Sequence, residues 1–160
     1  MPDHILERRF WLPRPRPEVF EFFADPRNLA AVTRASARLT WLAPPPERLA
    51  AGSVLDFSLR IAAMPLRWRV MVREFDAPYR FVDAQLWGPF ARWEHRHRFV
   101  DAPEREGAAA SLGTWVEDRV TYRLPLGPLG SLAHRLGAGR RITAAFEYRE
   151  ARARQILTGR

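Results

Sequence analysis

The segment YRFVDAQLWGPFARWEHRHRFVD, residues 79–101, contains two stretches of strand character on either side of a glycine-proline pair. In residues 90–101, charged side chains alternate with aromatic rings and histidines, which is the two-residue period of a β-strand. Residues 79–87 are rich in aromatic and β-branched residues and also suit a strand. Only Gly88-Pro89 lies between them, and so short a link joins antiparallel neighbours. The segment therefore predicts a β-hairpin.

Further segments of strand character lie on both sides of this hairpin. Prolines, glycines and short links separate them, so successive strands are again expected to run antiparallel. In most of these segments charged side chains alternate with apolar ones, which predicts a sheet with one charged face and one mostly apolar, aromatic face. These segments are residues 4–12, 36–43, 53–61, 66–76 and 113–124.

Two short helices and one long helix complete the pattern. Pro17 suits the first turn of a helix, and Asp25-Pro26 is a start signal for a second short helix. Residues 131–157 predict one long helix, because no turn residue interrupts them after Gly139. Gly137 and Gly139 weaken it by about 1 kcal/mol each relative to alanine, so we expect them to serve close packing or a bend. The stripe that should face the sheet contains Leu132, Leu136, Gly139, Thr143 and Phe146.

The resulting order is a strand, two short helices, six antiparallel strands and a long C-terminal helix, which is the order of a helix-grip fold. In this order, and in several local motifs, the chain resembles the SRPBCC superfamily of START-like proteins. That superfamily includes polyketide cyclase/dehydrase-like and birch-pollen-allergen-like members, and the similarity is strongest to a bacterial branch. The motifs are PEVF at 17–20, DPRNL at 25–29, PYRFVDAQ at 78–85, GPF at 88–90 with Trp93, His95, His97 and Phe99, DRVTYRLP at 118–125, and GPLG at 127–130.

The resemblance implies an α+β protein in which a curved antiparallel sheet of about seven strands wraps around the long C-terminal helix. It implies that residues 1–160 form a single START-like domain. It also implies a central cavity that binds an apolar or amphipathic molecule, such as a lipid, polyketide or isoprenoid, for transport or sequestration. The aromatic sheet face agrees with such a cavity. The expected cavity residues are Phe57, Trp68, Phe81, Asp83, Gln85, Trp93, His95, His97, Phe99, Asp118, Val120, Tyr122, Leu136 and Phe146.

Several cavity residues are polar, which a plain core would not contain. If residues 88–90 form a three-residue turn, Asp83 faces His95 and Gln85 faces Trp93. The next hairpin could bring Asp118 beside the histidines.

Three interpretations of these polar residues remain open. They can form a buried network whose members satisfy one another and shape the pocket. Alternatively, His95 or His97, oriented by Asp118 or Asp83, can serve acid–base catalysis in an enzyme of the cyclase, dehydratase or isomerase type. Finally, a His-x-His pair with a carboxylate can bind iron or zinc. We favour the network, and therefore expect no catalytic residue, no metal and no cofactor.

The composition excludes some chemistry and suggests a second kind of partner. The chain has no cysteine, and all 26 of its basic residues are arginine, which excludes disulfides, thiolate sites and lysine Schiff bases. The net charge is +8, so the charged sheet face could contact an anionic membrane or another partner, or could simply be solvated. Nucleic acid is not expected, because only Trp115 interleaves with the arginines. The arginines of this face are Arg67, Arg69, Arg92, Arg96, Arg98, Arg119 and Arg123.

Targeting signals are not apparent in the sequence. Residues 1–9 contain no apolar run of signal-peptide length. No stretch approaches the ~20 apolar residues of a membrane-spanning helix. We therefore expect a cytoplasmic protein.

Overall fold

The sheet of this protein has seven antiparallel strands. The computed structural model describes residues 3–61, 64–104 and 112–159. The strand order is β1-β7-β6-β5-β4-β3-β2, so β1 pairs with the last strand and every other neighbour is consecutive along the chain. The strands are β1 (His4–Leu12), β2 (Thr40–Trp41), β3 (Val54–Ile61), β4 (Met64–Asp76), β5 (Arg80–Trp87), β6 (Arg92–Pro103) and β7 (Leu112–Arg123).

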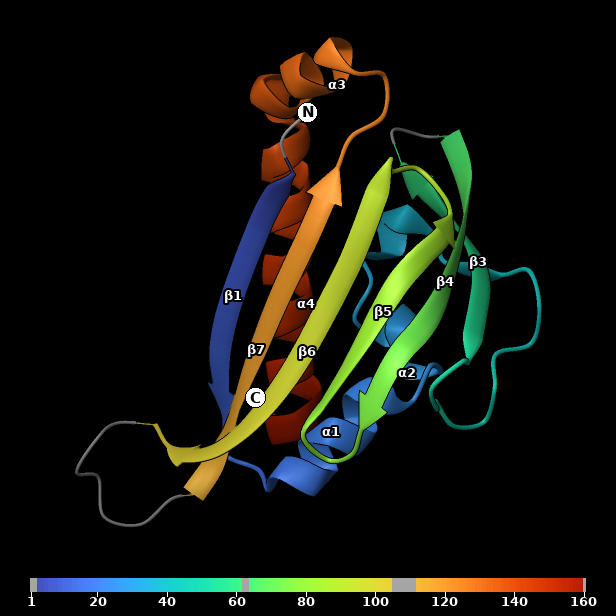
Figure 1. Ribbon diagram of the computed structural model, residues 1–160. Helices are drawn as coiled ribbons and strands as arrows, with labels where there is room; N and C mark the ends of the chain where they lie inside the picture. Colours follow the sequence, from blue (N-terminus) through green and yellow to red (C-terminus); the bar gives the residue numbers. More distant parts are fainter. Residues whose placement is uncertain (1–2, 62–63, 105–111, 160) are drawn as a thin grey trace.

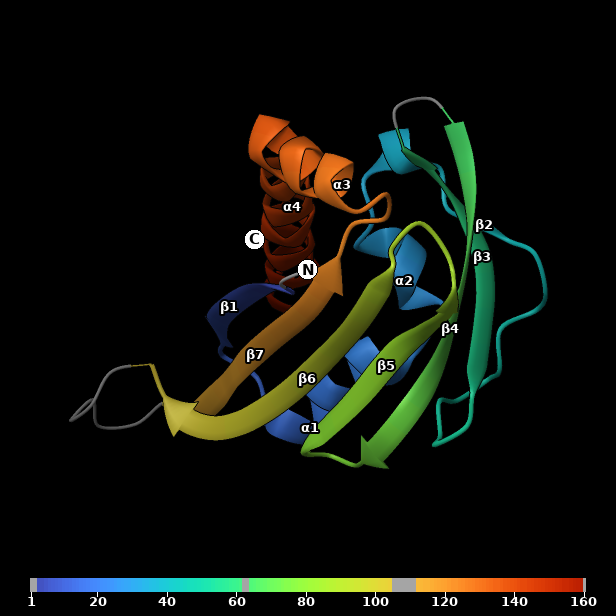
Figure 2. The same cartoon turned by 45° about the horizontal axis from the view of Figure 1, so that its top comes forward.

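The helices lie on one side of this sheet, which curves around them (Figure 1 and Figure 2). In Figure 1, α4 runs behind β1 and β7. This arrangement confirms the predicted α+β helix-grip fold, with two short helices after the first strand and a long C-terminal helix. None of the helices in the described ranges is long and apolar enough to cross a membrane. The helices are α1 (Arg16–Ala24), α2 (Asn28–Ala31), the 3₁₀ turn η1 (Ala35–Ala37), α3 (Pro128–Ala133), the π-helical segment η2 (His134–Ala138) and α4 (Gly139–Thr158).

The long C-terminal helix predicted for residues 131–157 is present, but it is bent. A bend at Gly137, whose φ is +131°, divides it into α3, η2 and α4. Only glycine adopts such a φ readily, so the bend anticipated for these glycines is present. At Gly139 an added Cβ would lie 2.7 Å from Nε2 of His134, so this glycine allows close packing.

The bend also moves the start of the apolar stripe. Leu136 is 79% exposed and Leu132 is exposed as well. Leu136 is therefore not on the sheet-facing side, and its prediction as a cavity residue was wrong. The buried stripe of α4 begins later in the chain, at Phe146, and continues through Ala153 and Leu157.

The strand predicted for residues 36–43 is much shorter in the structure. Only Thr40–Trp41 pairs with β3. The preceding residues form η1, which ends at Arg38 in the left-handed region with φ +39°. Because the left-handed conformation of Arg38 breaks the extended backbone, the paired strand begins only at Thr40.

The buried apolar residues form three clusters, which the partly buried Phe75 and Trp68 link to one another. The first joins α1 and the end of α4 to the sheet and includes Phe20, Phe81 and Phe99. The second lies on β3 and β4, around Phe57. The third joins Phe146 of α4 to β6 and β7. The region between the three clusters is therefore the first place to look for a functional site.

Candidate functional site

Four polar side chains from three neighbouring strands meet on the inner face of the sheet. Asp83 comes from β5, His95 and His97 from β6, and Asp118 from β7; we call them the His–Asp cluster. Asp83 is the register partner of His95, as predicted from the hairpin. Asp118 is the partner of His97, so the second hairpin also brings its carboxylate to the histidines. His97 is 2% exposed and Asp118 is 4% exposed.

One oxygen of Asp118 contacts both imidazoles. Asp118 Oδ1 lies 2.9 Å from Nε2 of His95 and forms a hydrogen bond with it. The same oxygen lies 2.9 Å from Nδ1 of His97. This second approach lacks hydrogen-bond alignment, and among the described residues the buried Nδ1 of His97 has no hydrogen-bond partner.

The other ring nitrogens point to the second carboxylate. Asp83 Oδ2 lies 3.2 Å from Nε2 of His97, at hydrogen-bond distance. The same oxygen lies 3.9 Å from Nδ1 of His95. The two imidazoles also contact each other, with ring centroids 3.7 Å apart. The cluster thus consists of two imidazole rings between two carboxylates, as in the network interpretation. One polar atom, His97 Nδ1, has no hydrogen-bond partner among the described residues.

Burial determines the charge states within the cluster. It lowers the pKa of His95 to about 4, assisted by the charge of neighbouring His97 and opposed by the hydrogen bond with Asp118. Burial alone would raise the pKa of Asp118, but the hydrogen bond with His95 and the close approach of both imidazoles lower it well below its usual value. At neutral pH, therefore, His95 is neutral and Asp118 is ionised. Since an ionised carboxylate only accepts hydrogen bonds, His95 carries its proton on Nε2 and a lone pair on Nδ1.

The His–Asp cluster lies where the three apolar clusters meet. The ring of Phe81, from the first cluster, stacks on His97 at 4.1 Å between centroids. Phe146, from the third, meets His95 edge-on at 5.1 Å. Asp83 is the register partner of Val72, which belongs to the second. Polar side chains thus occupy the centre of the interior, with aromatic residues around them.

An aromatic wall extends from this centre toward β3. The ring of Trp68 contacts Phe57 at 5.9 Å and Trp93 at 4.9 Å between centroids. Trp93 in turn contacts Phe146 of α4. The predicted residues Val120 and Tyr122 belong to the same apolar cluster as Trp93, whereas Phe99 lies in the cluster with Phe81. Apart from Leu136, the predicted cavity residues therefore lie along the interior of the sheet.

The indole N–H of Trp68 is an unpaired donor in this wall. Its Nε1 is buried and has no hydrogen-bond partner among the described residues. The sequence marked Trp68 only as an inward aromatic residue. No local pattern could show the missing partner, because the rings that Trp68 contacts come from other segments of the chain.

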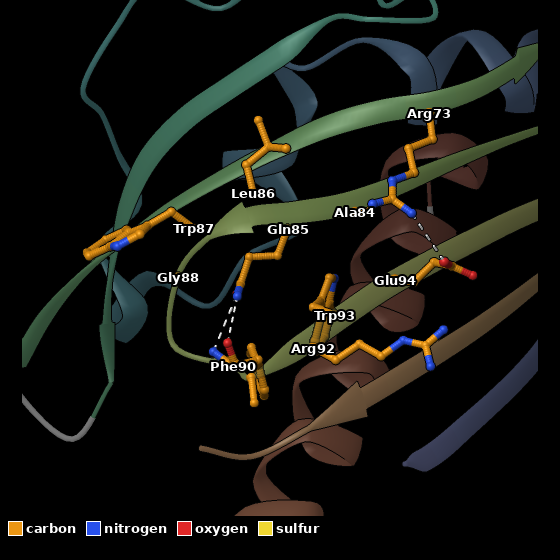
Figure 3. A pocket seen from close by; sticks show the side chains of 11 residues that line it. Arg73, Ala84, Gln85, Leu86, Trp87, Gly88, Phe90, Arg92, Trp93 and Glu94 are labelled. Carbon is orange, nitrogen blue, oxygen red and sulfur yellow. Dashed lines mark hydrogen bonds and ion pairs between the residues drawn. The ribbon is translucent and has the colours of Figure 1, made fainter. Parts of the chain in front are cut away.

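A pocket of about 370 Å³ opens beside the wall, at the turn of the β5–β6 hairpin (Figure 3). Pairing of the two strands ends at Ala84 and Glu94, so Gln85 and Trp93 do not form the pair that was predicted. Instead the Gln85 side chain bridges the opening: its Nε2 donates to the Phe90 carbonyl at 2.7 Å, and the Phe90 N–H donates to its Oε1 at 3.3 Å. The pocket lining includes Arg92 and Glu94 of the outer face and no described residue of α4, so this pocket differs from the cavity predicted between sheet and helix. The sequence did not indicate the other lining residues Arg73, Leu86, Trp87 and Phe90.

Known proteins resemble this chain in fold and not in sequence family. No protein-family model and no curated protein matches the sequence. Among solved structures, the protein TTHA0849 from Thermus thermophilus matches with a TM-score of 0.68 and 21% identity, over 94% of this chain and 97% of that one. A START superfamily protein from Mycobacterium smegmatis matches with a TM-score of 0.67 and 14% identity, over 96% and 99% of the two chains. The chain has the START-like helix-grip fold.

A third match shows the same START-like fold inside a longer protein. A nucleoside-diphosphate sugar epimerase from Corynebacterium glutamicum matches with a TM-score of 0.66 and 25% identity, over 96% of this chain. The match spans only 29% of the epimerase. These similarities concern the fold, which hosts many functions, so the function must be argued from the site.

The outer face of the START-like sheet carries the arginines predicted to lie there, but acidic residues neutralise most of them. Five of the seven arginines form ion pairs with acidic residues, in four groups. Arg69 and Arg96 have no acidic partner among the described residues, so they are the ones most available to a partner molecule. The paired groups are Arg67 with Asp56, Arg92 and Arg123 with Asp3, Arg98 with Glu117, and Arg119 with Glu7.

Proposed function

We propose that residues 1–160 form one START-like domain that binds an amphipathic small molecule between the inner face of the sheet and α4. The class that we propose is a lipid, polyketide or isoprenoid, and the role is transport or sequestration. The observation that carries the proposal is the buried, unpaired N–H of Trp68 within an aromatic wall. The meeting of three apolar clusters around polar side chains supports it.

The proposal assigns different parts of the ligand to different parts of the wall. A buried donor without a partner costs about 1–3 kcal/mol, and a ligand oxygen that accepts the Trp68 N–H would recover that cost. The apolar body would lie against Trp93 and Phe146, where burial contributes about 25 cal/mol per Å². A molecule with a hydrocarbon or polycyclic body and a carbonyl or carboxylate meets both requirements.

The test is competition between a fluorescent apolar probe and ligands with or without an oxygen acceptor. The probe is 1-anilinonaphthalene-8-sulfonate, and the competitors are a long-chain fatty acid and the corresponding alkane. Trp68→Phe retains an aromatic ring but removes the N–H. We expect this variant to bind the fatty acid about 5- to 150-fold more weakly and the alkane almost unchanged.

The matched control is Trp115→Phe. The Trp115 Nε1 donates to the Pro103 carbonyl at 3.2 Å, so its loss removes a hydrogen bond away from the wall and should leave both affinities unchanged. Failure of the wild type to bind the probe, or equal effects of the two substitutions on the fatty acid, would overturn the proposal. If the proposal holds, native mass spectrometry of protein purified from its own host would identify the natural ligand.

The hydrogen bond between His95 and Asp118 favours a second candidate, acid–base catalysis of the cyclase, dehydratase or isomerase type. The carboxylate fixes the His95 tautomer, as general-base catalysis requires. Against this role, a pKa of about 4 makes His95 a weak base at neutral pH. Turnover of a bound polyketide that disappears in His95→Gln would favour catalysis over binding alone.

A further inference from the structure

We propose that Asp83, His95 and His97 bind a divalent first-row transition metal ion, with Asp118 as the outer carboxylate that orients the imidazoles. One ligand atom from each of the three residues lies within 4.8 Å of the others. This proposal revises our expectation of no metal. It does not depend on the ligand proposed above, because it rests on the His–Asp cluster and not on the aromatic wall.

The two separations from Asp83 fall within the span of ligands around one ion. Metal bonds to imidazole nitrogen and carboxylate oxygen are about 2.1 Å long, so adjacent ligand atoms lie roughly 3.0–3.4 Å apart and opposite ones about 4.2 Å apart. The distance from Asp83 Oδ2 to Nε2 of His97 is 3.2 Å. The distance from the same oxygen to Nδ1 of His95 is 3.9 Å, within the same span.

The outer carboxylate prepares both rings for this role. Histidines that bind metals almost always donate their other ring N–H to a carboxylate, carbonyl or water. Asp118 pairs with Nε2 of His95, which leaves Nδ1 directed to the Asp83 side. It also lies 2.9 Å from Nδ1 of His97, whose Nε2 is on the Asp83 side. A small rotation of the His97 ring on metal binding would align its N–H with Asp118 and satisfy the one buried atom of the cluster that lacks a partner.

The three inner atoms can all donate electron pairs to a cation. A carboxylate oxygen has free lone pairs, and each neutral imidazole has one nitrogen with a lone pair. One proton can bridge Asp83 to His97, but it leaves His95 Nδ1 without a donor, and no other hydrogen bond to that nitrogen occurs within the described ranges. A metal ion accepts electron pairs from all three at once.

The donor set indicates which metals fit. Imidazole suits zinc, copper, iron and nickel, whereas magnesium and calcium prefer oxygen ligands. Two histidines and one carboxylate leave coordination positions open, as in non-haem iron centres and in catalytic zinc sites. The Asp83 side chain is 18% exposed while both histidines are almost fully buried, so water or a substrate oxygen could complete the coordination from the Asp83 side.

The test uses untagged, chelator-treated protein titrated with Zn²⁺ in a calorimeter and with Co²⁺ in a spectrophotometer. We expect one ion per chain, with a Kd below about 10 µM, and a visible Co²⁺ absorption that is displaced by Zn²⁺. Asp83→Asn preserves side-chain shape and should weaken binding by more than about tenfold, and Asp118→Asn by about 10- to 100-fold. Circular dichroism verifies that each variant is folded.

The matched control removes the other pair of adjacent histidines. The rings of His4 and His134 stack at 3.6 Å between centroids, and such a pair could capture an ion adventitiously. The double variant His4→Ala/His134→Ala should bind as tightly as the wild type. The proposal is overturned if the wild type binds no ion stoichiometrically, if only the double variant loses binding, or if folded Asp83→Asn binds like the wild type. Should Asp83→Asn not fold, the wild-type stoichiometry together with the double variant decides the outcome.

Discussion

The stability of this protein should fall in acid because His95 is buried in its neutral form. Its pKa is lowered from the ordinary 6.5 to about 4, chiefly by burial. Between these two values the unfolded chain binds a proton at His95 that the folded chain does not. The unfolding free energy contributed by His95 is therefore fully present above pH 6.5 and is lost as the pH falls toward 4.

The size of the effect follows from the difference between the two pKa values. Each unit corresponds to about 1.4 kcal/mol, so His95 should account for a loss of about 3 kcal/mol across this window. Asp118 also has a lowered pKa, but its contribution is present above its ordinary value of 3.8 and is lost only at lower pH. In the window above pH 4 the loss therefore comes mainly from His95, with a smaller contribution from His134, whose pKa is also lowered by burial.

The assay is urea unfolding followed by tryptophan fluorescence at several pH values between about 7 and 4, in the presence of a chelator. His95→Gln has no imidazole, so its unfolding free energy should change by about 3 kcal/mol less than that of the wild type. His134→Gln is the control: burial lowers the pKa of His134 too, but that residue is only half-buried, so its substitution should alter the slope much less. Equal acid losses in the wild type and in His95→Gln would refute the buried neutral state of His95.

Three further predictions concern the cluster, the bend and the outer face. Asp118→Ala should cost about 1–3 kcal/mol of unfolding free energy, and much less on a His95→Ala background; strict additivity in this cycle would mean that the two residues do not interact. Gly137→Ala should cost about 1–3 kcal/mol through the backbone alone, because an added Cβ has nothing within 4 Å of it; an unchanged melting temperature would contradict the bend. Anionic vesicles should sediment the protein at low salt and release it at about 1 M salt, where screening acts over about 3 Å; equally negligible binding to neutral and anionic vesicles would leave the arginine face without a membrane partner.

The sequence alone was sufficient for the order of the elements and for the inner and outer faces of the main strands. Side chains in a strand alternate between faces, and a turn of two or three residues allows few registers. Those two local rules predicted that Asp83 faces His95, and the structure confirms it. Alternation also placed Asp118 on the face of the histidines, but the eight residues between β6 and β7 fix no register, and only the structure shows that Asp118 pairs with His97.

Only the tertiary structure decided how these side chains meet. That one oxygen of Asp118 contacts both rings, and that His97 Nδ1 and Trp68 Nε1 lack partners, depends on side-chain rotations in a packed interior. The sequence allowed either a bend or close packing at Gly137 and Gly139, and only the structure shows that the bend lies at Gly137. Alternation along a strand predicts only which face of the sheet each side chain lies on. The distances of 3–4 Å on which hydrogen bonds and metal binding depend are set by sheet twist and by packing from segments far away in the chain.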